Sequence, residues 1–283
     1  MSERNFKQLI EARWAEGKFV CVGLDSELGK IPASVHQKAA GRISDAVVAF
    51  NRAIVDATKD IVCAYKPNGA FYEALGTSGI NALLETILYI HKVAPDVPVI
   101  LDAKRADIGN TNDGYVKAAF DFLQADAITV HPYLGAEALQ PFLARGDKGI
   151  IVLCRTSNPG AGEFQDLTVF GQGPLYRVVA WRVASKWNKN GNCALVVGAT
   201  YPDELHEVRG LVGDMPILIP GIGAQGGDLE KTVRAGKNSR GRGMIINSSR
   251  GIIFASSGED FAEAARRETL KLHEAIRWCL AAS

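Results

Sequence analysis

The feature that most constrains the fold of this chain is a short apolar run, rich in β-branched residues, that recurs eight times along 283 residues. Most of these runs are apolar at nearly every position, which is typical of strands buried on both faces of a parallel sheet. The runs occupy residues 19–25, 61–67, 97–104, 127–131, 149–155, 193–199, 216–222 and 244–250.

Segments with helical periodicity separate these runs. In the segment after the first run, for example, Ile43, Val47 and Phe50 recur at helical spacing, and residues 79–93 continue the pattern after the second run. Eight strands, each followed by a helix, predict an α/β fold of the (β/α)8 TIM barrel type. An open doubly wound sheet is the alternative, but that fold does not require eight matched strand–helix units. No Pro-, Gly- or Ser-rich linker divides the chain, so we expect one barrel domain over residues 1–283.

The composition argues against several other classes of protein. A net charge of +1 gives no reason to expect binding to nucleic acid or to an acidic membrane. The N-terminal segment is charged and helical in pattern, and no apolar run is long enough to span a bilayer, so we expect a cytoplasmic protein. The cysteines are odd in number, lack C-x-x-C spacing and lie mostly inside apolar runs, which predicts buried thiols and not disulfides or metal ligands.

Charged or polar residues end six of the eight runs. In a barrel the carboxyl ends of the strands meet at one rim, where the active sites of barrel enzymes lie. A single polar residue there only marks where solvent begins, but six such strand ends together predict a functional site. These residues are Asp25, Lys66, Asp102 with Lys104, His131, Arg155 and Arg250.

The last two strand ends suggest a phosphate site. The stretch PGIGAQGGDLEK follows the seventh run, and its glycines leave the backbone free to approach a ligand. The stretch NSSRG follows the eighth run and supplies Arg250, whose guanidinium can bind an anion. A glycine loop alone is more often just a turn. Because the loops after strands seven and eight often bind phosphate in barrels, the combination predicts a phosphate-bearing ligand.

A second cluster lies in VILDAKRADIGNTN, residues 99–112. Asp102 and Lys104 are two residues apart on one strand, so they share a face and point into the mouth of the barrel. Asp107 falls past the strand end, and Lys66 ends the neighbouring strand. The charges alternate in sign, which would let the cluster survive partial burial. A structural ion-pair network is the alternative, but the position beside a predicted phosphate site favours a catalytic role.

The segment LDAKRADIGNT resembles the signature of the orotidine 5′-monophosphate decarboxylase family. Further motifs match in order along nearly the whole chain: GLD, YKP, SNPGA, GAQGG and SSRG. Residues 156–192 are similar to the bacterial subgroup that has a long loop after strand five. The resemblance implies an enzyme that converts orotidine 5′-monophosphate to uridine 5′-monophosphate, the last step of de novo pyrimidine nucleotide synthesis, without metal or cofactor.

The resemblance also implies roles for individual residues in catalysis. Lys104 would give a proton to C6 of the pyrimidine, and Asp102 would sit against the substrate carboxylate. Lys66 and Asp25 would hold the ribose and orient the charged cluster. No motif for a cofactor that could accept electrons is present, so electrostatic stabilisation of the C6 carbanion is expected to supply most of the catalysis.

Other residues would bind the substrate or complete the site. Asp107, a fourth catalytic residue, and Thr111 would reach the ribose from the neighbouring subunit of a homodimer. Ser157 would hydrogen-bond the pyrimidine amide, and Gln225 and Arg250 would hold the phosphate. Because a lysine is already assigned as the proton donor, we favour a structural role for His131.

Two other functions share parts of this pattern. The metal-dependent 3-keto-gulonate 6-phosphate decarboxylases and hexulose-phosphate synthases share D-x-K-x-x-D, but the resemblance leads us to expect an acid in those enzymes where this chain has Lys66. A non-catalytic nucleotide-binding barrel would be expected to have lost a charged partner, and all four are present.

Overall fold

The computed structural model describes residues 4–222 and 228–282. Its main sheet has eight strands in the order β2-β1-β10-β9-β8-β5-β4-β3, with parallel pairing between neighbours. Each predicted run matches one of these strands, and β3 extends one residue past its run. The strands are β1 Val20–Gly23, β2 Ala64–Lys66, β3 Ile100–Arg105, β4 Ala127–Val130, β5 Gly149–Arg155, β8 Cys193–Val197, β9 Ile217–Pro220 and β10 Met244–Ser248.

The first and last strands of this order, β2 and β3, meet and close the sheet into a barrel. Parallel bridges join Tyr65 to Val99 and Asn68 to Asp102. The backbone N–H of Asp102 donates to the carbonyl of Pro67 over 2.9 Å. This closure confirms the predicted TIM-barrel fold and places Lys66 of β2 beside Asp102 of β3.

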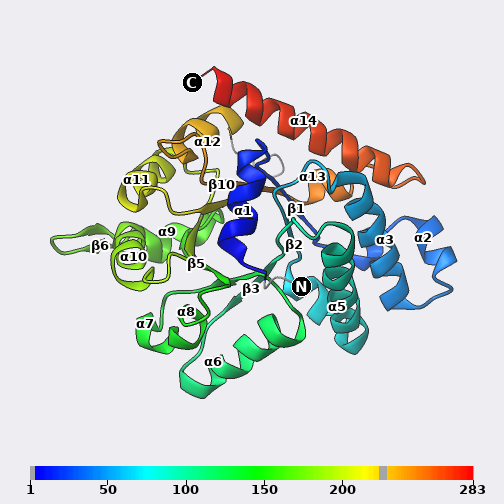
Figure 1. The fold of residues 1–283 in the computed structure, drawn as a ribbon, viewed down its shortest axis with the longest axis horizontal. Coiled ribbons are helices and arrows are strands. Elements are labelled where there is room, and N and C mark those ends of the chain that lie inside the picture. Colours follow the sequence, from blue (N-terminus) through cyan, green and yellow to red (C-terminus); the bar gives the residue numbers. More distant parts are fainter. Residues whose placement is uncertain (1–3, 223–227, 283) are drawn as a thin grey trace.

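Helices surround the barrel, as Figure 1 shows. The longer ones follow the predicted periodic segments, and two of them continue into π-helical turns at Lys117–Phe122 and Val183–Trp187. The longer helices are α1 Phe6–Ala15, α3 Ile43–Thr58, α5 Gly76–Val93, α6 Gly109–Val116, α10 Leu175–Arg182, α11 Pro202–Val212, α12 Leu229–Gly236 and α14 Phe261–Ala281. The short ones are α2 Ala33–Lys38, α4 Gly69–Glu73, α7 Gly135–Ala138, α8 Gln140–Leu143, α9 Gly162–Gln165 and α13 Arg250–Ile253.

Helix α1 covers the amino-terminal ends of the strands and crosses the centre of the view in Figure 1. The ring of Phe6 packs so closely on Gly149, the first residue of β5, that a side chain there would overlap it. Trp14 donates its indole N–H to the carbonyl of Met244, the first residue of β10, over 2.8 Å. With this end covered, the opposite rim is the end left for a functional site.

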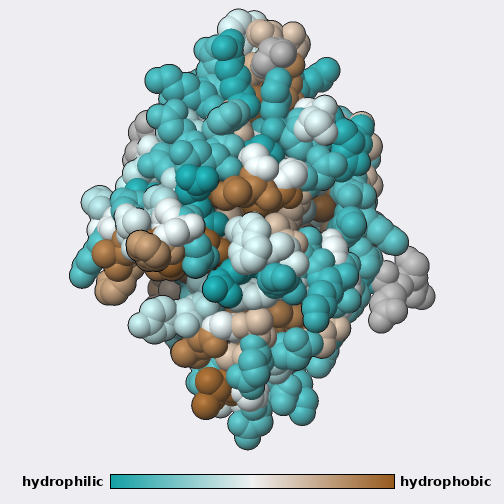
Figure 2. Space-filling model, turned by 90° about the vertical axis from the view of Figure 1, so that its left-hand side faces the viewer, coloured by the Kyte–Doolittle hydropathy of each residue, from teal (hydrophilic) through white to brown (hydrophobic). Residues whose placement is uncertain are grey.

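The connection from β5 to α10 is long and carries structure of its own. It contains α9 and a small antiparallel hairpin of β6 Thr168–Val169 and β7 Gly173–Pro174. Phe170 at the hairpin tip is almost fully exposed. Figure 2 shows hydrophobic patches among hydrophilic side chains on this side of the molecule. The apolar run pattern did not predict this hairpin, because its strands are only two residues long.

The thiols and the helices agree with two expectations from the sequence. Cys21, Cys63, Cys154 and Cys193 are buried free thiols, and Cys279 is buried as well. Burial raises the pKa of the Cys193 thiol to about 12, so it stays protonated and unreactive at neutral pH. Within residues 4–222 and 228–282, no helix is long and apolar enough to cross a membrane.

Asp126, just before β4, ties the amino-terminal end of the barrel together. Its fully buried carboxylate accepts hydrogen bonds from Arg4 at 2.8 and 2.9 Å and from the backbone N–H of Val99 at 2.8 Å. Burial alone would raise the pKa of Asp126, but His91 and Arg4 outweigh it and lower the pKa to about 2. Asp126 therefore stabilises the fold in its ionised form.

Asp126→Asn should lower the free energy of unfolding at pH 7 by about 3 kcal/mol, since the pKa lies about two units below that of an unfolded aspartate and each unit is worth about 1.4 kcal/mol. The contribution of a carboxylate with a lowered pKa is complete above the unfolded pKa, about 4, and is lost as the pH falls towards about 2. Urea denaturation between pH 7 and pH 3 measures this. Asp121→Asn, in an exposed pair with Arg145, is the control and should cost well under about 1 kcal/mol. A gap between wild type and Asp126→Asn that does not narrow at low pH would contradict the assignment.

Candidate active site

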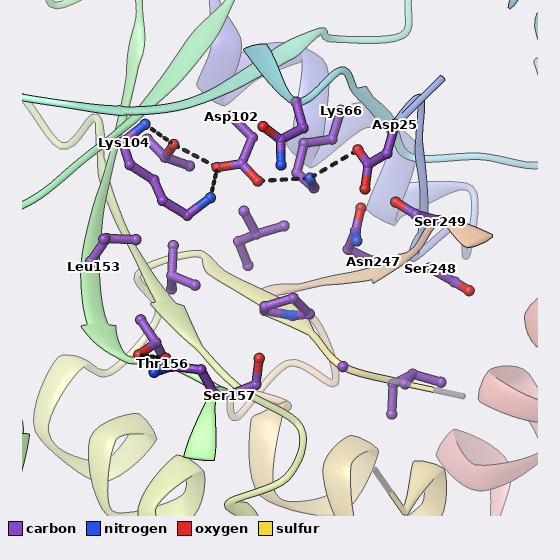
Figure 3. Close-up of a pocket in the computed structure, with 18 of the residues that line it drawn as sticks. Asp25, Lys66, Asp102, Lys104, Leu153, Thr156, Ser157, Asn247, Ser248 and Ser249 are labelled. Atoms are coloured by element: carbon purple, nitrogen blue, oxygen red, sulfur yellow. Dashed lines mark hydrogen bonds and ion pairs between the residues drawn. The ribbon is translucent and has the colours of Figure 1, made fainter. Parts of the chain in front are cut away.

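A cavity of about 490 Å³ opens at the carboxyl ends of the strands. Residues from or just beyond all eight strands of the main sheet line it, as expected for the active rim of a barrel. Its polar lining includes Asp25, Lys66, Asn68, Asp102, Lys104, Thr129, Thr156, Ser157, Asn158, Gln165, Asn247, Ser248, Ser249 and Arg250. Figure 3 shows the charged cluster on one side and Thr156 and Ser157 across the cavity from it.

Asp102 lies between two lysines. Its Oδ2 accepts from Lys66 Nζ at 2.9 Å, and its Oδ1 accepts from Lys104 Nζ at 2.7 Å (Figure 3). Burial alone would raise the pKa of Asp102, but the two ammonium groups outweigh it and hold the pKa well below its usual range. The carboxylate therefore stays ionised although it is only 9% exposed.

Lys66 is held between two acids. Besides Asp102, its Nζ lies 3.9 Å from Oδ1 of Asp25. Burial alone would lower the pKa of Lys66, but Asp102 and Asp25 outweigh it and raise the pKa above its usual range. That same Oδ1 of Asp25 is buried and accepts no hydrogen bond from the protein. It is therefore suited to accept one from a ligand hydroxyl.

Lys104 reaches the cavity through an irregularity in β3. The pairing of β3 with β4 shifts register between Leu101 and Arg105, and Lys104 adopts a positive φ of 50°. Its side chain is half exposed, in contrast to that of Lys66. The ammonium is therefore paired with Asp102 on one side and open to a ligand on the other.

Two of the residues predicted at strand ends, Arg155 and His131, do not line the cavity, although other residues of their strands do. In a regular strand Arg155 would share a face with Leu153, which lines the cavity, but the register of β5 shifts between these residues and Arg155 is not in the lining. Its guanidinium instead stacks on Tyr201, 3.8 Å from the ring centroid. His131 also lies outside the lining, and its backbone N–H donates to the carbonyl of Arg105. Arg155 and His131 therefore do not join the other strand-end residues at the cavity, and a structural role was already favoured for His131.

Arg155 holds the long loop after β5 against the barrel. It contacts Oε1 of Gln165 at 3.4 Å and Oδ2 of Asp166 at 3.2 Å, both in or next to α9. Gln165 in turn accepts from the backbone N–H of Thr156 at 2.9 Å and donates to the hydroxyl of Thr156 at 2.8 Å. These contacts fix the shape of the loop beside Ser157.

The remaining predicted residues fall into three groups. Ser157 and Arg250 line the cavity. Asp107 and Thr111 do not line the cavity of their own chain, and Asn112 fixes their loop by accepting from the N–H of Asp107 and donating to its carbonyl. Gln225 lies outside the described residues. Within one chain, therefore, the acid that joins Lys66, Asp102 and Lys104 is Asp25 and not Asp107.

The structure also adds residues that the sequence patterns did not single out. Thr129 and Asn247 line the cavity from β4 and β10, and each is a polar residue inside an otherwise apolar run, which is a signal that could have found them. Asn68 follows β2 by two residues. Gln165 gave no signal, because it reaches the cavity from a helix within a loop. In the described parts of the chain, no group of three or more His, Cys, Asp or Glu side chains could hold a metal ion.

The fold and the cavity define a TIM-barrel protein with a lysine–aspartate–lysine cluster at its active rim. A family model described as Orotidine 5'-phosphate decarboxylase / HUMPS family matches residues 18–267. The chain belongs to this family.

Individual relatives agree with the family model. The chain is 51% identical to Orotidine 5'-phosphate decarboxylase of Ralstonia pickettii and 50% identical to that of a Janthinobacterium species, each over 96% of this chain and 97% of the relative. A solved Leishmania donovani OMP decarboxylase is 39% identical, with a TM-score of 0.81 over 97% of this chain and 99% of that chain. The chain spans 57% of a solved Leishmania donovani UMP synthase chain, to which it is 40% identical, with a TM-score of 0.86 over 98% of this chain.

Arg155→Met should raise the KM for the phosphate-bearing substrate by about tenfold, because the loss of a charged hydrogen bond costs about 1.5–3 kcal/mol and would loosen the loop that carries Ser157. Steady-state kinetics and limited proteolysis of the loop are the measurements. Arg177→Met, at a partly buried arginine on α10 that pairs with Glu207, is the control. If KM and the proteolysis rate of Arg155→Met equal those of the control, the loop does not depend on Arg155.

Proposed function

We propose that this chain decarboxylates orotidine 5′-monophosphate to uridine 5′-monophosphate, the last step of de novo pyrimidine nucleotide synthesis, with Lys104 as the proton donor. The observation that carries the proposal is the buried carboxylate of Asp102 between Lys66 and Lys104, at the rim of the cavity. Relatives about half identical to this chain bear the name of this decarboxylase, which supports the reaction.

The chemistry requires stabilisation of a localised negative charge. When the bond between C6 and the carboxylate breaks, its electron pair stays on C6 in an orbital that the ring cannot delocalise well. An ammonium at about 4 Å in an environment of effective dielectric constant about 20 is worth about 4 kcal/mol, or about three decades in rate. Lys104 then gives a proton to C6, and this completes the product.

Asp102 has the complementary task. Its carboxylate, held ionised by the two lysines, would repel the substrate carboxylate, and the repulsion would be relieved as CO₂ leaves. Binding energy from groups remote from C6 must then seat the substrate. Lys66 keeps Asp25 and Asp102 in place, and Oδ1 of Asp25, which accepts no hydrogen bond from the protein, would accept one from a ribose hydroxyl.

The two other sides of the cavity suit the base and the phosphate. Ser157 lies across the cavity from the charged cluster and would hydrogen-bond the pyrimidine amide (Figure 3). Arg250 begins α13 just after β10 and, with Gln225, would hold the phosphate. The exposed position of Arg250 leaves its guanidinium accessible to a ligand from solvent.

The family description also covers HUMPS enzymes. A residue of the site therefore has to distinguish the proposed decarboxylase from the metal-dependent alternative. Lys66 is a cation, 3% exposed and in ion pairs with Asp25 and Asp102. A positive charge at this point opposes the binding of a divalent cation beside the same acids. Lys66 therefore favours a decarboxylase that works without a metal over the metal-dependent alternative.

The protein would work as a cytoplasmic homodimer of one-domain subunits, without a nucleic-acid or membrane partner. Asp107 and Thr111 do not line their own cavity, and the neighbouring Ile108 is 61% exposed. In such a dimer Ile108 would be buried together with this loop. A two-fold dimer would bury this loop symmetrically and bring Asp107 and Thr111 to the partner's cavity.

The first test is an assay with orotidine 5′-monophosphate in excess chelator, following the loss of substrate absorbance. The wild-type protein should turn over fully. Lys104→Ala should lose turnover while still binding uridine 5′-monophosphate, because Lys104 acts at C6 and not at the phosphate. Lys38→Ala, an exposed lysine on α2, is the control. Activity that stops in chelator and returns with magnesium, or a Lys104→Ala variant that keeps most of the rate, would refute the proposal.

The second test is subunit mixing of the inactive variants Lys104→Ala and Asp107→Ala. In a mixed dimer one site lacks both groups and the other has both, so random exchange should restore about a quarter of wild-type activity. Mixing Lys104→Ala with Asp102→Asn is the control, since both residues line the cavity of one chain and no mixed dimer regains an intact site. If Lys104→Ala and Asp107→Ala stay inactive when mixed, Asp107 serves its own barrel.

A further inference from the structure

We infer that Thr129 is a positioning residue whose hydroxyl holds both Asp102 and Lys104 in their reactive arrangement. Thr129 lies on β4, one strand away from these two residues, and is 1% exposed where it lines the cavity. The inference deepens the proposed function, and it rests on Lys104 as the proton donor.

The hydroxyl of Thr129 closes a ring of three hydrogen bonds. Its Oγ1 accepts from the backbone N–H of Lys104 at 3.0 Å and donates to Oδ1 of Asp102 at 2.8 Å. The same Oδ1 accepts from Lys104 Nζ at 2.7 Å. Figure 3 shows these dashed contacts beside Lys104. Thr129 therefore contacts the backbone of the lysine and the partner of its ammonium at once.

The directions of these hydrogen bonds are fixed by chemistry. A backbone N–H can only donate, so the hydroxyl oxygen must accept from Lys104. An ionised carboxylate can only accept, so the hydroxyl proton must point to Asp102. A hydroxyl meets both demands with one atom, whereas a valine side chain of nearly the same shape meets neither.

The backbone of Lys104 needs such a partner. A φ of 50° is unfavourable for a residue with a side chain, and it occurs where β3 loses its regular pairing with β4. The shift removes a regular ladder partner from this stretch, and the side chain of Thr129 accepts from the backbone N–H of Lys104 instead. The direction in which the Lys104 side chain leaves the strand therefore depends on a side chain of the neighbouring strand.

Loss of the Thr129 hydroxyl should affect the chemical step and not substrate binding. The ammonium of Lys104 ends a long and half-exposed side chain, so the position of its Nζ depends on the backbone behind it and on Asp102 in front. Loss of the hydroxyl would let both groups move while the phosphate and ribose contacts stay unchanged. We therefore expect kcat to fall and KM to remain nearly constant.

The test compares Thr129→Val with Thr129→Ser. Removal of the hydroxyl should lower kcat by about ten- to a hundredfold, the effect of losing a hydrogen bond to a charged group, and leave KM within about twofold. Thr129→Ser keeps the hydroxyl and should restore kcat to within about threefold of wild type. The affinity for uridine 5′-monophosphate should match wild type in both variants.

The matched control is Thr269→Val. Thr269 on α14 is also fully buried, but its hydroxyl donates only to the carbonyl of Ala265 in its own helix, at 2.7 Å. This variant should keep the wild-type kcat while losing thermal stability to a similar degree as Thr129→Val. If Thr129→Val does not fold, Thr129→Ala is judged by the same kcat criterion.

Three results would overturn the inference. One is a kcat of Thr129→Val within about twofold of the control, which is less than a single weak hydrogen bond would give. Another is a Thr129→Ser variant as slow as Thr129→Val, which would assign the effect to packing of the methyl group. The third is a Lys104→Ala variant that keeps its turnover, because then the proposed function and this inference both fail. Lys104→Ala is therefore assayed alongside to separate the two proposals. If it is inactive while Thr129→Val is fully active, only this inference fails.

Discussion

The ionised carboxylate of Asp102, held between the ammonium groups of Lys66 and Lys104, is the interaction on which the rest of the structure depends. A buried carboxylate without partners would be costly and would take up a proton, and then it could neither hold the two lysines nor face a negatively charged substrate group. Lys104 lies on the same strand as Asp102, but Lys66 lies on β2, so the complete cluster exists only because the barrel closes between β2 and β3. The charge state of Asp102 thus depends on the closure of the barrel.

In the proposed mechanism the same constraint would separate binding from chemistry. A substrate carboxylate placed beside Asp102 would meet a like charge, so Asp102 would contribute little to affinity. Groups on other sides of the cavity, such as Arg250 and Ser157, are free to supply it. The cavity is wide enough to keep these tasks apart, and the loop that carries Ser157 is held in place from outside by Arg155.

Much of the fold could be predicted from the sequence, because its signals are local. Each buried parallel strand is apolar at almost every position, and each helix repeats its apolar residues every three or four positions. The site was predicted less completely. Arg155 follows Leu153 at strand spacing, and only the register shift in β5 turns it out of the cavity. Thr129 was marked only as a polar residue inside an apolar run, and Gln165 reaches the site from a helix within a loop that neither periodicity nor a strand end marks.

The sequence by itself determined the barrel, the rim at which polar groups gather, and the alternation of charge in Asp102 and Lys104. These follow from residue types and their spacing along one chain. The tertiary structure decided which groups meet: that Asp25 and not Asp107 pairs with Lys66 within one chain, that Arg155 supports a loop, and that Thr129 bonds to Lys104. The physical reason is that register between strands, and the breaks in it, depend on contacts between residues far apart in sequence, which no local pattern records.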